Sequence, residues 1–322
     1  MIKTRAAVAA VLALSTCLIT AAGRPANIED VDRAAAAVAA VAENQGVVIG
    51  TAVHGADLSA EGELADVVIS VDPNAPIVVS GAGNGPDRTV SIGLPQESDV
   101  DPAVVSDGTV VFEGRGADSA DVAVQVIADG SVQILTVIPS PDASHEYSYP
   151  LTLPPGTRLV PEVGGGVTAL DPDGNFVAGL APPWAKDATG ADVSTSYRIE
   201  GTTVVQDVAV ADPDAYPVVA DPWMGIALID DVTVSFVSGY GNRYFVYPSW
   251  WGRVGAPAIA RGAAWEDAKS WYPTGMNRDN LRDQFWCHFD FRLTTFAKGS
   301  WNLETWRPNV GWAATVAAKC NP

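Results

Sequence analysis

A chain of 322 residues with a formal net charge of −19 would be repelled by nucleic acid, so its composition argues against DNA binding. The length suits two domains, or one domain with a large appendage. The charge is unevenly spread, because residues 24–222 carry 30 acidic and 7 basic side chains, whereas residues 223–322 carry 8 and 10. Nine of the ten tryptophans also lie in residues 223–322, so we expect a change of domain near residue 223.

The first 23 residues have the features of a secretory signal peptide. Lys3 and Arg5 precede an apolar run that ends in small residues, and we expect cleavage between Ala22 and Arg24. The run is shorter than the roughly 20 apolar residues that a bilayer span requires, so no retained transmembrane anchor is expected. The sequence thus predicts a secreted protein, with association to the cell surface left open.

Residues 24–46 predict a single Ala-rich helix. Asp30 or Asp32 can cap its N-terminus, alanine favours the helical state, and Gly46 can end it. Its apolar side consists mostly of methyl groups, so we expect this helix to dock only loosely.

Residues 47–222 predict an acidic, mainly β region. Short β-rich runs alternate with turn residues at near-regular spacing, which is typical of an antiparallel sandwich. ADGS (128–131) and DPDG (171–174) are expected to form hairpin turns. GAGNG (81–85) is not followed by a helical pattern, and DPDGN (171–175) lacks the further carboxylates of a calcium loop. We therefore predict no cofactor and no metal.

Residues 223–322 predict a small α+β domain, which we call the C-terminal domain. Residues 226–255 have the pattern of two strands around a Gly-rich turn. Apolar residues at helical spacing predict helices at 257–273 and 277–286. Further strands are expected in three segments: HFDFRL (288–293), WNLETWRP (301–308) and WAATVAA (312–318).

Two cysteines, Cys287 and Cys320, remain after the expected cleavage. An exported chain meets an oxidising environment, so we predict that they form a disulfide. The bond would close a loop of about 34 residues and hold the C-terminus in place. A metal site at Cys287 and His288 lacks further thiol or imidazole ligands nearby.

Two segments resemble sequences from exported actinobacterial proteins. Residues 149–223, which end in AYPVVADPW, resemble a module that precedes quite different C-terminal segments, and this implies a carrier or spacer. DQFWCHFDF (283–291), KGSWNLETWRPNVGW (298–312) and CNP (320–322) resemble the actinobacterial "domain of unknown function 2599" family over about residues 226–322. The resemblance implies a secreted domain closed by a disulfide, and it supplies no active site.

Four residues are candidates for catalysis: His288, Lys298, Glu304 and Arg307. A histidine and a carboxylate could transfer protons in phosphodiester hydrolysis, while the two cations stabilise the developing charge. The structural alternatives are a histidine bonded to a carboxylate or carbonyl, and a Glu304–Arg307 ion pair that positions a loop. The sequence favours these alternatives, so we assign no catalytic residue.

Aromatic residues suggest a binding surface. If Trp250 and Trp251 lie on a strand, one of them points outward beside Tyr247 and Arg253, where it could stack on a sugar. Large aromatics stabilise a small core efficiently, so we expect burial for most of five other tryptophans of the C-terminal domain. These five are Trp265, Trp286, Trp301, Trp306 and Trp312.

The leading functional hypothesis is an extracellular or cell-surface interaction module. The acidic β-rich region would act as a stalk that presents the Trp-rich domain to a cell-wall glycan or a surface protein. The alternative is a secreted antibacterial effector with RNase-like hydrolase activity, and only this alternative calls for an immunity partner. A purely structural exported protein is the third hypothesis. The sequence contains no nucleophile elbow, metal motif or cofactor loop, which favours binding over catalysis.

Overall fold

The computed structural model describes residues 17–18, 25–42, 52–54, 57–62, 64–81, 88–95, 98, 100, 102–105, 107–116, 118–162, 165–249, 252–253, 261–293 and 298–322. Several predicted features lie outside these residues: the signal peptide apart from Cys17–Leu18, the helix end at Gly46, most of GAGNG, and Trp250 with Trp251. Among the described helices, none combines the length and hydrophobicity that a membrane span requires.

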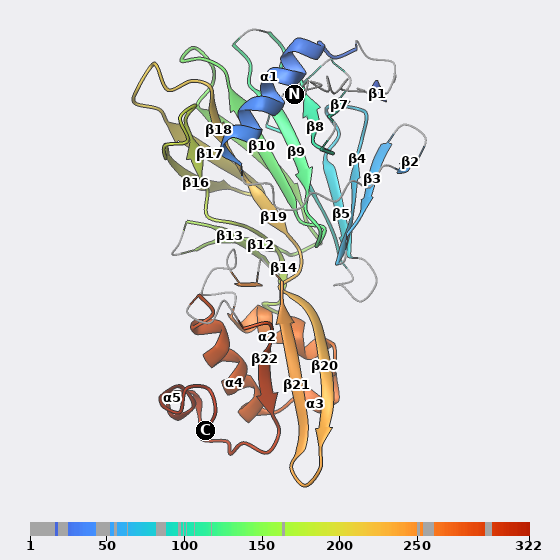
Figure 1. Ribbon diagram of the computed structural model, residues 1–322, viewed down its shortest axis with the longest axis vertical. Helices are drawn as coiled ribbons and strands as arrows, with labels where there is room; N and C mark the ends of the chain where they lie inside the picture. The colour runs from blue at the N-terminus through green and yellow to red at the C-terminus, as the bar shows by residue number, and fades with distance from the viewer. Residues whose placement is uncertain are drawn as a thin grey trace, which may run out of the picture.

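Two antiparallel sheets build the β-rich region (Figure 1). The first runs in the order β1 (Cys17–Leu18), β7 (Ala103–Val104), β8 (Val110–Phe112), β9 (Asp121–Val126), β10 (Val132–Ile138), β19 (Trp223–Gly225), β14 (Phe176–Leu180), β13 (Val167–Leu170) and β12 (Arg158–Pro161). In the same sheet, β18 (Val218–Ala220) pairs with both β10 and β15 (Ala185–Lys186). The second sheet runs in the order β16 (Ser194–Glu200), β17 (Thr203–Ala209), β11 (Glu146–Thr152), β6 (Thr89–Ile92), β5 (Ile77–Gly81), β4 (Ala65–Ile69), β3 (Asp57–Glu61) and β2 (Ala52–His54).

Apolar side chains from the two sheets share one core. Val67 and Ile92 from the second sheet and Val122 and Ile134 from the first belong to a single buried cluster. The expected turns are present, since β9 pairs with β10 and β13 with β14. Gly130 and Gly174 occupy positive φ in these turns, a conformation that glycine adopts without steric cost. The predicted antiparallel β region is therefore confirmed.

Helix α1 (Ile28–Val41) lies across the outer face of the first sheet, over β8, β9 and β10 (Figure 1). Its N-cap is Asn27, whose side chain accepts a hydrogen bond from the Glu29 amide, so the expected caps Asp30 and Asp32 were wrong. Both aspartates lie inside the helix and therefore cannot be its N-cap, and the Asp30 carboxylate instead accepts from Asn27 Nδ2 at 2.7 Å. The helix does not dock loosely, because its inward side chains are fully buried on the sheet: Val31, Ala34 and Val38.

The segment that joins the two regions of distinct composition is buried. Val218–Ala220 and Trp223–Gly225 are strands of the first sheet, and all six residues are buried. Asp221, between them, accepts a hydrogen bond from the Trp184 amide at 2.9 Å and has no exposed surface. The junction is therefore a packed part of the first sheet and not an exposed linker.

A three-stranded antiparallel sheet organises the C-terminal domain. Its order is β20 (Ile229–Val237), β21 (Gly241–Pro248) and β22 (Trp301–Glu304). The helices are α2 (Arg261–Ser270), α3 (Pro273–Met276), α4 (Asp279–Asp290) and α5 (Trp312–Ala317). On one face, Tyr244, Val246 and Leu303 are buried with side chains of α2 and α4. Side chains of the opposite face, such as Phe245 and Asn302, are only half-buried, so this face of the sheet is open (Figure 1).

Two predicted strands of the C-terminal domain are wrong. The segment 288–293 contains the last turn of α4, because the apolar spacing of Leu281 and Phe285 continues to Phe289 and outweighs the short alternation. The segment 312–318 is mainly α5, which begins after Gly311. The structure confirms the strand pair β20–β21, strand β22 and the two predicted helices. Helix α4 ends four residues later than expected.

The tryptophan prediction holds for two of the five residues. Trp265 and Trp301 are buried and contact Phe285. Trp286 and Trp306 are half-buried, and Trp312 is 42% exposed. The core is thus aromatic as expected, but several indoles lie at its edge.

A buried ion pair joins the β-rich region to the C-terminal domain. Arg88 Nη2 lies 3.5 Å from Asp267 Oδ1, and Arg88 Nη1 donates to the carbonyl oxygens of Phe176 and Val177. Burial raises the pKa of Asp267, and the Arg88 charge partly opposes this shift. Phe176 also packs in the same apolar cluster as the C-terminal helices, so the two regions share both polar and apolar contacts.

Candidate functional site

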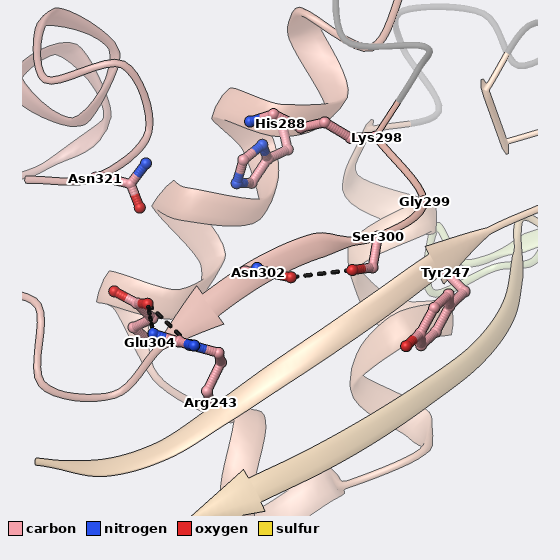
Figure 2. Close-up of a pocket in the computed structure, with 9 residues that line it drawn as sticks. All are labelled: Arg243, Tyr247, His288, Lys298, Gly299, Ser300, Asn302, Glu304 and Asn321. Atoms are coloured by element: carbon pink, nitrogen blue, oxygen red, sulfur yellow. Dashed lines mark hydrogen bonds and ion pairs between the residues drawn. The ribbon is translucent and has the colours of Figure 1, made fainter. Parts of the chain in front are cut away.

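A pocket of about 480 Å³ lies beside strands β21 and β22 of the C-terminal domain (Figure 2). Its walls come from β21, the end of α4, the approach to β22, β22 itself and the C-terminal segment. Its lining residues are Arg243, Tyr247, His288, Lys298, Gly299, Ser300, Asn302, Glu304 and Asn321. The pocket therefore gathers residues that are far apart in the sequence.

Glu304 is held by two arginines at one end of the pocket. Its Oε1 accepts from Arg243 Nε at 2.9 Å and lies 2.7 Å from Arg243 Nη2, and its Oε2 accepts from Arg307 Nε at 2.6 Å. Its backbone is fixed as well, because the Glu304 amide donates to Gln284 Oε1 and the Gln284 side chain donates back to the Glu304 carbonyl. With 5% of its surface exposed, this carboxylate is largely removed from solvent and neutralised by the two guanidiniums. The predicted Glu304–Arg307 pair is present, and Arg243 completes it.

His288 forms an inner wall of the pocket. It is 3% exposed, and its ring lies parallel to the indole of Trp301 at a centroid distance of 6.3 Å. Burial, together with the nearby Lys298 charge, lowers the pKa of His288 to about 4, while the Asn302 backbone opposes the shift. Neither ring nitrogen has a hydrogen-bond partner of normal geometry among the described residues. The side chain is therefore a neutral imidazole at pH 7 whose ring nitrogens make no hydrogen bond of normal geometry within the described residues.

Arg253 fixes the segment that carries Lys298. Its guanidinium donates to the carbonyl oxygens of Pro248 at 3.2 Å, Lys298 at 2.9 Å and Gly299 at 2.6 Å. This cation, which the sequence placed beside an aromatic surface, is therefore engaged with backbone groups. The Lys298 side chain is exposed and has no carboxylate partner among the described residues.

The pocket unites three of the four catalytic candidates with one binding candidate. His288, Lys298 and Glu304 line it together with Tyr247, while Arg307 supports Glu304 from outside the lining. Sequence reasoning missed Arg243, Ser300 and Asn321. Arg243 could have been found only from the strand register, which places it opposite Glu304. The two residues are 61 positions apart, so no local sequence pattern reveals this pairing.

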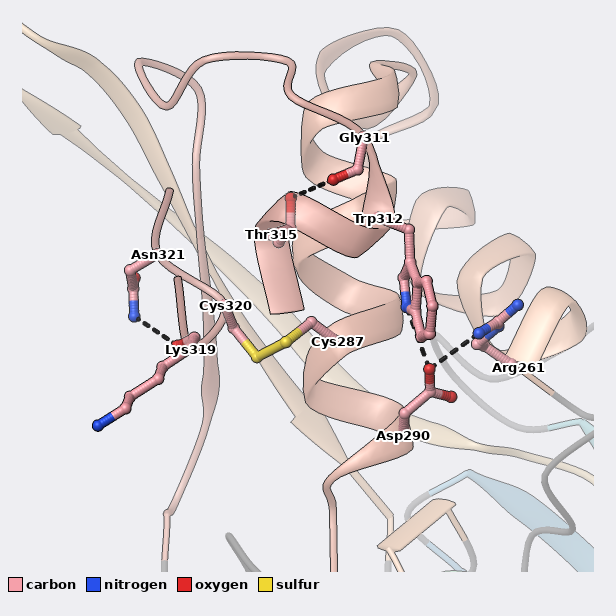
Figure 3. Close-up of a disulfide and its surroundings, with 9 residues drawn as sticks. All are labelled: Arg261, Cys287, Asp290, Gly311, Trp312, Thr315, Lys319, Cys320 and Asn321. Atoms are coloured by element: carbon pink, nitrogen blue, oxygen red, sulfur yellow. Dashed lines mark hydrogen bonds and ion pairs between the residues drawn. A yellow bond between two sulfur atoms is a disulfide. The ribbon is translucent and has the colours of Figure 1, made fainter. Parts of the chain in front are cut away.

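A second pocket of about 300 Å³ adjoins the first, and the two share His288 and Lys298. Its other walls are Cys287, Phe291, Val316, Lys319 and Cys320. The predicted Cys287–Cys320 disulfide is confirmed and connects the end of α4 to the C-terminal segment (Figure 3). On the same helix, Asp290 Oδ2 accepts from Trp312 Nε1 at 3.2 Å and pairs with Arg261 Nη1 at 2.8 Å. These contacts hold α5 and the C-terminal segment beside the pockets.

The arrangement suits binding better than proton transfer. A general acid or base works best with a pKa near the operating pH, whereas burial keeps His288 neutral until about pH 4. Glu304 is occupied on both oxygens by guanidinium groups. Lys298, Ser300, Asn302 and Tyr247 instead supply polar groups that a ligand could contact. Among the described residues, no cluster of carboxylate, imidazole or thiol groups is arranged to hold a metal ion.

A family match covers the same part of the chain. Residues 234–322 match the family described as "Protein of unknown function (DUF2599)". These residues form a DUF2599 domain. The resemblance inferred from the Cys-His, Trp-Asn-Leu-Glu and Cys-Asn-Pro elements is thereby confirmed for this domain, and every residue that lines the two pockets lies within it.

Two mycobacterial proteins are similar to part of the chain. The uncharacterized protein Rv0477 of Mycobacterium tuberculosis and the uncharacterized protein Mb0487 of Mycobacterium bovis are each 37% identical to it over 81 residues. The aligned stretch is 24% of this chain and 54% of each relative. The chain thus spans about half the length of the curated relatives that it matches.

Proposed function

We propose that this protein is an exported interaction module whose C-terminal domain binds a ligand in the pocket of Tyr247, His288 and Lys298. The observation that carries the proposal is the convergence of these side chains, from β21, α4 and the approach to β22, on one pocket. Their scaffold is rigid, because the arginine contacts of Glu304 and Arg253 fix the strands and the Lys298 segment. Rigid placement of a few polar groups is what a specific binding site requires.

The signal-like N-terminus and the disulfide support export. In this proposal the acidic β-rich region is the carrier, and the domain that it presents meets a cell-wall glycan or a surface protein. Trp250 and Trp251 follow Ser249, next in sequence to the pocket strand β21, and one of them would extend the site by stacking on a sugar ring.

Co-sedimentation of the mature chain, from residue 24 onward, with purified peptidoglycan tests the proposal. Tyr247→Ala should weaken binding because Tyr247 lines the pocket, whereas Tyr240→Ala, at an exposed hairpin tip, is a matched control and should not. Trp250→Ala or Trp251→Ala should weaken binding by about 10- to 100-fold if that ring stacks on the ligand. Equal binding by wild type, Tyr247→Ala and both tryptophan variants would reject the proposed site.

One observation favours a second candidate, a secreted antibacterial effector with hydrolase activity. His288, Lys298 and Glu304 line the same pocket, as an RNase-like mechanism would require. In that case His288→Ala should lower RNA cleavage by about 100- to 10,000-fold. Purified mature protein that leaves RNA, glycans and peptides intact would exclude this candidate and would remove the reason for an immunity partner.

A further inference from the structure

We propose that the ligand of this pocket carries an anionic group, a carboxylate or a phosphate, that binds between Lys298 and His288. This inference rests on the proposed binding function and names the chemistry that the pocket would recognise. It follows from the charge of the two adjoining pockets, from the buried imidazole and from the way in which Lys298 is held.

The charge around the two pockets is positive. Among the described residues that line them, Glu304 is the only carboxylate, and Arg243 and Arg307 already neutralise it. Lys298 and Lys319 line the pockets without an acidic partner in the part of the chain that the structure describes. The chain as a whole has a net charge of −19, whereas these two lysines make the charge around the adjoining pockets positive. A positive charge here favours the binding of an anion.

The imidazole of His288 adds a donor to this positive site. Its ring is buried against Trp301, and neither nitrogen has a partner of normal geometry among the described residues. A buried polar group without a partner costs free energy, and a ligand that accepts its N–H removes this cost. The positive charge of Lys298 disfavours a cationic ligand beside His288. An anion can both pair with the Lys298 ammonium and accept the His288 N–H.

The site is also pre-organised. Arg253 holds the carbonyls of Lys298 and Gly299, and Ser300 Oγ donates to Asn302 Oδ1 at 3.0 Å. The segment therefore keeps its shape in the absence of a ligand, which lowers the entropy lost on binding. Figure 2 shows Lys298 and His288 side by side above Ser300 and Asn302, with Tyr247 next to Ser300.

Nuclear magnetic resonance of the histidine rings tests the inference in the full mature chain. The sequence has three histidines, so the His288 signals can be assigned with a His288→Gln variant. The probes are inorganic phosphate, acetate and, as a neutral control, glucose, all at constant ionic strength in potassium chloride. Phosphate or acetate should shift the His288 signals in a saturable way and raise the pKa of His288, because a bound anion stabilises the imidazolium. The His145 signals should not respond.

A lysine variant separates specific binding from general screening. Lys298→Met keeps most of the side-chain volume and removes the charge, and it should weaken anion binding by about 10- to 100-fold. Lys269→Met, on α2 and outside both pockets, should leave it unchanged. A response to glucose alone, a response that chloride reproduces, or equal affinity in Lys298→Met would overturn the inference. Peptidoglycan binding that depends on Tyr247 but not on Lys298 would also overturn it, and would leave the proposed function standing.

Discussion

In the β-rich region the deeply buried side chains are mostly aliphatic, as at Val67, Val122 and Ile134, whereas the C-terminal domain buries Trp301, Phe285 and Phe289 and adds a disulfide. The difference follows from size. A large pair of facing sheets encloses enough surface for many small contributions, while a domain of about 100 residues gains more from large aromatics and a covalent link. The pocket lies in the small domain, where few residues determine both stability and the site.

Replacing Trp301 should test this difference most severely. Trp301 has no exposed surface and contacts Phe285, Phe289 and His288, so Trp301→Ala should destabilise the C-terminal domain by about 3–5 kcal/mol. Denaturant unfolding followed by circular dichroism measures the loss. Trp312→Ala is the matched control, since its exposed indole should contribute about 1 kcal/mol or less. Similar losses for the two variants would contradict an aromatic core centred on Trp301.

Reduction of the Cys287–Cys320 disulfide should affect the two regions unequally. The bond joins residues 33 positions apart, and loss of such a constraint should lower the stability of the C-terminal domain by about 3–4 kcal/mol. The β-rich region should be unaffected, because the one cysteine before Cys287 is Cys17, which lies in the expected signal peptide. Calorimetry with and without reductant compares the two transitions. A Cys287→Ser/Cys320→Ser variant should reproduce the reduced protein, and an equal shift of both transitions would show that the bond supports the whole molecule.

Local patterns were sufficient to predict much of this organisation. Apolar spacing predicted helices α2 and α4, turn residues predicted the hairpins at Gly130 and Gly174, and the pair Cys287 and Cys320 predicted the disulfide. The errors also have local causes. HFDFRL alternates over too few residues to distinguish a strand from the last turn of a helix, and WAATVAA has no polar face that would reveal α5.

The candidate site was predictable in its parts but not in its assembly. His288, Lys298 and Glu304 were candidates by residue type, yet their meeting depends on strand register and on the path of the chain after α4. The environment of each side chain was beyond the sequence as well. The Glu304–Arg307 pair was predicted, but the second guanidinium on Glu304, that of Arg243, and the burial of His288 against Trp301, which depresses its pKa, were not.

Acidification should act on the two regions in opposite directions. Below about pH 6.5 the unfolded chain protonates His288, whereas the folded domain resists until about pH 4, so the free energy of unfolding should fall by about 3 kcal/mol between pH 7 and pH 4. In the β-rich region, burial raises the pKa of Asp221, so its folded state holds a proton that the unfolded state loses as the pH rises above about 4. Asp221 therefore favours folding more strongly at low pH.

Unfolding measured from pH 7 to pH 4 in His288→Gln and Asp221→Asn variants isolates these two contributions. As the pH falls, the free energy of unfolding of the wild type should fall relative to that of His288→Gln. It should rise relative to that of Asp221→Asn. Differences that stay constant over this range would contradict the buried state of the group concerned.

The smallest effect is expected at an exposed charge cluster of the β-rich region. Arg198 pairs with Glu146 and Glu200, and its Nε lies 3.3 Å from Asp207 Oδ2, but its side chain is 41% exposed. Exposed ion pairs contribute little, so Arg198→Gln should cost less than about 1 kcal/mol at low salt. The cost should shrink further in about 1 M salt, because screening weakens the repulsion among the three carboxylates that the arginine leaves behind. Urea unfolding at the two salt concentrations measures both values. A larger cost that persists in high salt would mean that the β-rich region depends on specific polar contacts as well as on its aliphatic core, and it would narrow the contrast with the C-terminal domain.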